Sequence, residues 1–173
     1  MKPQDILVAL KIQSLCDRGV DAPSSWPQRL IAEETGLSLS EVSGACRRLE
    51  KVGLLSPGPR KVVRSALLEF LVHGVKYAFP VTMGAATRGM PTGYAADPLK
   101  DQFLTSTDEL VPVWPDARGT ARGMALEPLY RSVPMAARRD RRLYEYLALL
   151  DAIRAGRARE RAKAVELLSK RLG

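Results

Sequence analysis

The stretch "WPQRLIAEETGLSLSEVSGACRRLEKVGLL", residues 26–55, carries the strongest local signals in the chain. Pro27 favours the first turn of a short helix over residues 27–35, and Gly36 is typical of the residue that ends one. Ser38 and Glu41 have the spacing of a capping box, in which the serine hydroxyl and the glutamate carboxylate each accept a main-chain N–H at a helix start. Four apolar residues then recur at the spacing of one buried helical face: Val42, Ala45, Cys46 and Leu49. The pattern predicts two helices joined by a short turn.

The flanking residues extend this prediction on both sides. Apolar residues at helical spacing predict an amphipathic helix over residues 3–15. Gly53 is expected to end the second helix of the pair. Residues 54–63 are then expected to form two short strands around a tight turn at residues 56–59, because proline and glycine dominate that turn. A further helix is expected over residues 64–79.

Two runs in this region resemble the winged helix-turn-helix of bacterial MarR-type and related regulators. The first is R-x-I-A-x-x-x-G-L-S-x-x-x-V-S over residues 29–43, and the second is RRLE-x-x-GLL over residues 47–55. The resemblance covers about a third of the chain. Two later runs, "TRGMPTGYA" at 87–95 and "EPLYRSVP" at 127–134, are similar to a bacterial group labelled MarR-like. The resemblance implies a DNA-binding domain whose second helix enters the major groove.

The resemblance also implies which residues would contact DNA. Base readout would come from Ser40, Ser43 and Arg47 on the recognition helix, with Arg47 placed to bond guanine. The phosphate contacts would come from six further residues: Gln28, Arg29, Arg48, Lys51, Arg60 and Lys61. Leu39, Glu41 and Gly44 depart from the family pattern, since polar residues, threonine and arginine are common at these three places. Because of these departures, position 44 in the middle of the helix has no side chain that can hydrogen-bond to a base.

The rest of the chain differs from this region in composition. Proline and glycine recur through residues 79–135, and the segments 110–114 and 120–126 are expected to pair as a β-hairpin across a five-residue loop. Helical spacing returns from about Met135, with Gly156 either between two helices or within one. We therefore expect a mainly α (α+β) fold in three parts. These are a winged helix-turn-helix DNA-binding domain at 1–78, an irregular Pro/Gly-rich segment with a β-hairpin at 79–135, and basic helices at 136–173.

Composition and charge indicate which kinds of partner and cellular location to expect for this protein. The 173 residues carry a net charge of +8, which favours a polyanionic partner. Residues 1–63 contribute +2, residues 64–135 are neutral and residues 136–173 contribute +6, so most of the excess lies away from the helix pair. No apolar run approaches the roughly 18 residues of a membrane span, and the start does not resemble a signal peptide. We expect a cytoplasmic protein with reduced cysteines and no membrane association.

The function expected is that of a sequence-specific transcriptional regulator, acting as a repressor and homodimer on double-stranded DNA. We expect no metal site, because the single His73 has no Cys/His cluster around it. We also expect no enzyme activity and no cofactor, because the spacing of the residues indicates no Ser/His/Asp or Cys/His arrangement. The alternative is a protein-interaction module, such as an antitoxin or autoregulatory partner of a neighbouring protein, whose residues 81–173 bind that partner. A ligand sensor lined by Tyr94 and Trp114 is compatible with the first function, although core packing also explains these aromatic residues.

Overall fold

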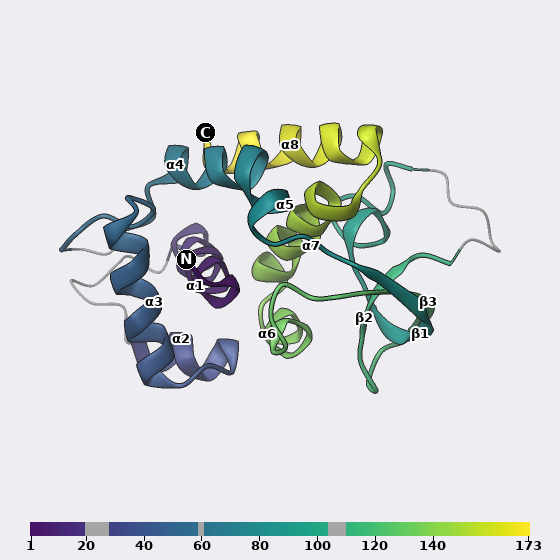
Figure 1. The fold of residues 1–173 in the computed structure, drawn as a ribbon, viewed down its shortest axis with the longest axis horizontal. Helices are drawn as coiled ribbons and strands as arrows, with labels where there is room; N and C mark the ends of the chain where they lie inside the picture. The colour runs from purple at the N-terminus through teal and green to yellow at the C-terminus, as the bar shows by residue number, and fades with distance from the viewer. Residues whose placement is uncertain (20–27, 59–60, 104–109) are drawn as a thin grey trace.

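A computed structural model describes residues 1–19, 28–58, 61–103 and 110–173. The fold is mixed α+β, with helices on one side and a small three-stranded sheet on the other (Figure 1). One continuous hydrophobic core runs from Ile6 to Leu172. It includes residues from all three expected parts of the chain, whose boundaries near 78 and 135 stay a prediction.

Helix α1 (Pro3–Asp17) lies at the centre of the helical side, between α3 and α7 (Figure 1). Every residue from Asp5 to Leu15 is buried, so the helix is enclosed on all faces and is not the amphipathic surface helix that its apolar spacing predicts. The enclosed residues include the charged Asp5 and Lys11. Their burial requires charged partners from neighbouring helices.

The predicted helix pair is present as α2 (Gln28–Thr35) and α3 (Leu39–Lys51). Gly36 has φ +70°, the left-handed conformation that ends a helix at low cost only in glycine. The capping box is confirmed: the Ser38 hydroxyl accepts from the Glu41 N–H at 3.2 Å, and the Glu41 carboxylate accepts from the Ser38 N–H at 2.8 Å. The predicted apolar face of α3 is also buried.

The segment after α3 makes a narrow two-stranded turn. Leu55 and Val62 form an isolated antiparallel bridge, and the Ser56 N–H donates to the Lys61 carbonyl at 2.8 Å. The two short strands expected around this turn are thus represented by a single bridge between two residues. Arg60, predicted to contact phosphate, lies outside the described residues.

The helix expected over residues 64–79 is present but interrupted. It consists of α4 (Arg64–Glu69), a π-helical turn η1 (Phe70–Gly74) and α5 (Val75–Ala78). Gly74 packs closely under Phe70, because a Cβ at position 74 would lie 2.9 Å from the phenylalanine ring. A wider turn of this kind is a local helix bulge that apolar spacing alone does not predict.

The sheet consists of β1 (Met83–Pro91), β2 (Pro112–Pro115) and β3 (Ala121–Leu126), with the short helix η2 (Gly93–Ala95) after β1. Strands β2 and β3 correspond to the two segments expected to form a β-hairpin, but that pairing is wrong. Both strands run antiparallel to β1 and parallel to each other, with Pro112 opposite Met124. The three strands close on themselves, and β1 occupies a segment expected to be irregular.

Glycines explain why the chain closes in this way. A Cβ at Gly89 would collide with the Trp114 carbonyl, and a Cβ at Gly123 would collide with the Val111 carbonyl. Gly119 likewise approaches the Gly89 backbone too closely for any side chain. The absent side chains allow three backbones to meet at distances that a hairpin of larger residues could not reach.

The C-terminal third forms α6 (Val133–Arg139), α7 (Arg141–Ala155) and α8 (Ala158–Leu172). Gly156 therefore separates two helices. The Asp140 carboxylate caps α7 by accepting from the Leu143 N–H at 3.1 Å. It also accepts from Ser14 at 2.7 Å and from the Lys11 ammonium at 2.5 Å, which joins α7 to the centre of α1.

We predict that Asp140→Ala lowers the free energy of unfolding by about 3–5 kcal/mol, because the variant leaves the buried Lys11 short of a partner. Urea denaturation measures this loss. Although burial raises the pKa of Asp140, the hydrogen bonds from Lys11 and Ser14 hold it below its ordinary value. The stabilisation is thus present above the unfolded pKa of about 3.9 and disappears as the pH falls through the folded pKa.

The parent protein should accordingly lose more stability than Asp140→Ala between pH 5 and about pH 2. Equal losses in the two proteins would show that this carboxylate does not carry the acid sensitivity.

Candidate functional site

Helix α3 lies at the edge of the molecule and leaves one face open (Figure 1). Ser40, Arg47 and Lys51 are exposed on it, and Ser43 is half-buried. Leu39 is 55% exposed at the start of the helix, although it is a large apolar residue. Among the residues that the structure describes, Arg47 and Lys51 form no ion pair, so their charges are available to a ligand.

The adjacent Arg48 is differently placed. Its Nε and Nη2 donate to the two carboxylate oxygens of Asp5 at 2.8 and 2.6 Å, in the bidentate geometry that matches a guanidinium to a carboxylate. Asp5 is fully buried, and the bond to it raises the pKa of Arg48. The predicted phosphate contact of Arg48 stays a prediction, but its guanidinium is already engaged in attaching α3 to α1.

Gly44 lies next to the guanidinium of Arg48. A Cβ at position 44 would lie 3.1 Å from Nη1 of Arg48, tighter than ordinary packing. A side chain at position 44 would therefore require a slight shift of the Arg48 guanidinium that bonds to Asp5.

Glu41, the acidic residue on the open face, is also held by the protein. Hydrogen bonds from the Ser38 N–H and hydroxyl lower the pKa of Glu41, and Tyr130 and Arg131 add to the effect. The Tyr130 hydroxyl donates to Glu41 at 3.1 Å. The carboxylate is thus ionised, but its charge is partly offset by neighbouring donors.

Arg131 is a candidate residue that the sequence did not indicate. It is exposed, stacks its guanidinium 5.9 Å from the Tyr130 ring centre and lies near enough to Glu41 to lower its pKa. Glu41 and Tyr130 are 89 positions apart in the chain, which explains why no local pattern predicts this proximity. The structure therefore places Arg131 near the first turn of α3, in addition to Arg47 farther along the helix.

The remaining predicted contacts lie on α2 and after the bridge. Gln28 is half-buried at the first residue of α2. Arg29 is exposed and pairs with Glu33 at 3.1 Å, and a pair this exposed is easily exchanged for another anion. Lys61 is exposed beside the bridge. The described residues therefore gather most of the predicted positive charges on α2, α3 and the segment after it.

The basic C-terminal helix is less available than its composition indicates. On α8, Lys163 and Lys170 both pair with Glu166, at 2.9 and 2.6 Å, and these bonds lower the pKa of Glu166 to about 2. Arg171 pairs with Glu145 of α7 at 2.7 Å. Internal pairing and helix packing therefore account for much of this charge.

A second arrangement of interest surrounds the fully buried Asp151 on α7. Its carboxylate accepts from Thr92 at 2.9 Å, from the Trp114 indole N–H at 2.6 Å and from Arg154 at 2.7 Å. Burial raises the pKa of Asp151, while Arg154 and the other donors oppose that rise. Trp114 is thus a core residue with its polar atom satisfied, in agreement with the packing alternative for this aromatic residue.

Compared with known proteins, the chain matches no protein-family profile, no curated protein and no solved structure. Within the described ranges, no helix combines the length and apolar character needed to cross a membrane. The same ranges contain no group of three or more histidine, cysteine or acidic side chains arranged to hold a metal ion.

The two adjacent arginines of α3 provide a matched test of this site. We predict that Arg48→Met lowers the free energy of unfolding by about 3 kcal/mol, because Asp5 remains buried without its charged partner. Arg47→Met should change it by less than about 0.5 kcal/mol, as is usual for an exposed residue. Urea denaturation of both variants measures the difference, and equal effects would contradict the assignment.

Proposed function

We propose that this protein is a sequence-specific regulator that binds double-stranded DNA through a winged helix-turn-helix formed by α2, α3 and the bridged segment after α3. The observation that supports the proposal most strongly is the open face of α3. There Arg47 is exposed, forms no ion pair with any described residue and lies on the same helix as an exposed serine and an exposed lysine. An arginine in this position can donate two hydrogen bonds to guanine in the major groove.

In this proposal Ser40, Ser43 and Arg47 read bases. Gln28, Arg29, Lys51 and Lys61 contact phosphates, together with Arg60 from the sequence. Arg131 joins the phosphate contacts, because it is exposed beside Glu41 and offsets the repulsion between that carboxylate and the DNA backbone. Arg48 contributes indirectly by fixing the orientation of α3 through Asp5.

The protein acts in this proposal as a cytoplasmic homodimer and a repressor, without a cofactor and without enzyme activity. Two copies double the phosphate contacts, which compensates for a recognition helix with few base-reading groups. The operator is then expected to contain two inverted half-sites one helical turn apart.

We predict that Arg47→Ala weakens binding to an operator by about 5- to 150-fold, or 1–3 kcal/mol, and relaxes base preference at one position of each half-site. Selection from a random duplex pool supplies the operator, and a mobility-shift titration measures the affinities. Arg159→Ala is the matched control, since Arg159 is an exposed arginine on α8.

Failure of the pool to enrich any sequence would overturn specific binding. Absence of duplex binding even at low salt, with stable co-purification of another protein, would favour the interaction-module alternative through residues 81–173.

We predict a different effect for Arg131→Ala. Loss of a phosphate contact should weaken binding to operator and to unrelated duplex by similar factors, and should reduce the slope of log affinity against log salt by about 0.9. Titrations at several salt concentrations measure the slope. An unchanged slope would remove Arg131 from the interface without affecting the role of Arg47.

A further inference from the structure

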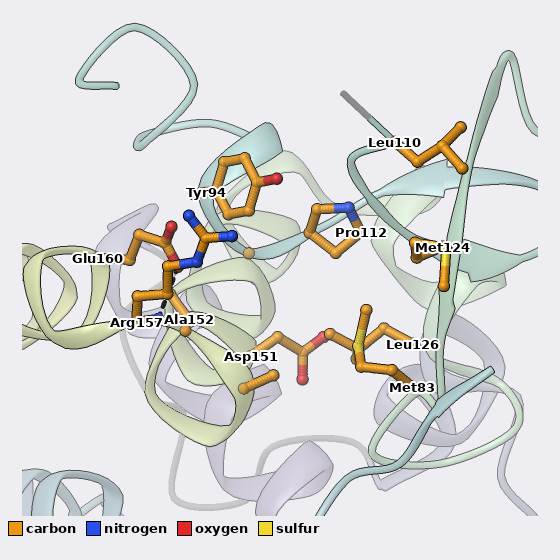
Figure 2. A pocket seen from close by; sticks show the side chains of 13 residues that line it. Met83, Tyr94, Leu110, Pro112, Met124, Leu126, Asp151, Ala152, Arg157 and Glu160 are labelled. Atoms are coloured by element: carbon orange, nitrogen blue, oxygen red, sulfur yellow. Dashed lines mark hydrogen bonds between the residues drawn. The ribbon is translucent and has the colours of Figure 1, made fainter. Parts of the chain in front are cut away.

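A cavity of about 310 Å³ is lined by residues of the sheet on one side and of helices α7 and α8 on the other. Figure 2 shows its walls: Met83 of β1, Met124 and Leu126 of β3, Leu110 and Pro112 before and in β2, and Tyr94 of η2. Helix α7 and the start of α8 form the opposite side. Most of the lining is apolar and is supplied by segments far apart in the sequence.

The mouth of the cavity has apolar surface that the described residues leave exposed. Met83 is 45% exposed and Leu110 is 44% exposed, and both are among the few large apolar side chains left in solvent. The pairing of β1 with β3 shifts register between Met83 and Ala86, directly at this wall. Bulges of this kind redirect side chains and are common beside ligand sites.

Charged side chains lie at the base and at the rim of the cavity. The Asp151 carboxylate at its base is saturated by Thr92, Trp114 and Arg154. At the rim, one basic and one acidic side chain, Arg157 and Glu160, lie together beside Tyr94 (Figure 2). The Glu160 carboxylate also accepts from the Arg157 N–H at 2.8 Å. Arg157 is exposed, so its charge stays in water, and the described lining that would contact a ligand is mainly apolar. An ionic ligand would therefore lose its hydration with little compensation.

The volume sets the size of the occupant. An apolar protein cavity of about 150 Å³ binds benzene, so about twice that volume suits two fused rings. The two methionines add to this fit, because thioether side chains adapt their shape and pack well against aromatic ring edges. Volumes near 300 Å³ are also at the lower end for small-molecule sites.

We propose that this cavity is a binding site for an uncharged, mainly apolar small molecule of about two fused rings. The site is separate from the open face of α3 and does not depend on DNA binding. The ligand covers the exposed parts of Met83 and Leu110 at the mouth, while the saturated Asp151 closes the base.

Three probes with the same ring system test both size and charge: neutral 2-naphthol, anionic 2-naphthoate and cationic 2-naphthylmethylammonium. Titration calorimetry of the full chain at pH 7 should give one site for 2-naphthol and at least about tenfold weaker binding for each ion, a factor that corresponds to about 1.4 kcal/mol. Equal or tighter binding of either ion would overturn the inference that the site is selective for uncharged molecules. Absence of 2-naphthol binding at millimolar concentration would overturn the site itself.

A matched pair of variants locates the binding. Ala155→Trp places a large side chain at the cavity from an exposed helical position, whereas Ala162→Trp makes the same change at an exposed position of α8 outside the cavity. The first variant should weaken 2-naphthol binding by at least tenfold and the second should leave it within twofold. Circular dichroism confirms that both are folded, and binding that survives in Ala155→Trp would place the probe elsewhere.

Discussion

Two charged side chains of α1, Asp5 and Lys11, are completely removed from water, and the arrangement of the helices around them depends on their pairing. Asp5 holds Arg48 of α3, and Lys11 holds Asp140 at the start of α7 together with Glu34 of α2. A buried charge without a partner costs several kcal/mol, whereas an apolar neighbour could pack in many ways. The two pairs therefore select which helices enclose α1 and in which register.

The pairing of Asp5 gives two adjacent arginines of α3 different roles. Arg47 and Arg48 have the same chemistry, but helix geometry points neighbouring residues about 100° apart, so one faces solvent and the other reaches Asp5. Gly44 lies against the guanidinium of Arg48 and has no side chain to offer a ligand. Recognition in the proposed function therefore rests on fewer side chains than the family pattern would supply.

Local patterns predicted the local structure well. The capping box at Ser38, the left-handed Gly36 and the buried face of α3 each depend on residues within one or two helical turns, and all three are confirmed. The sheet was not predictable in the same way. Strand β1 contains glycine and proline at places that weaken strand patterns, and its pairing with β2 and β3 depends on close backbone approach at Gly89, Gly119 and Gly123.

The candidate site was predictable only in part, because some of its contacts join residues far apart in the sequence. The sequence identified the exposed residues of α2 and α3, because helical periodicity separates an apolar face from a polar one. It could not show that Arg48 is bound to Asp5, which lies 43 positions earlier in the chain. It also could not show that Arg131 lies near Glu41. Long-range contacts of this kind leave no periodic trace in a single chain.

The turn at Gly36 has a consequence for how this chain can change over evolution. Met135 of α6 packs so closely against it that any side chain at position 36 would overlap the methionine tip. The turn is therefore shaped from both sides, by its own left-handed backbone and by a residue 99 positions later. A substitution at position 36 would therefore need both a backbone conformation that side chains rarely adopt and a shift of the Met135 side chain, which couples the turn to a helix in the C-terminal part of the chain.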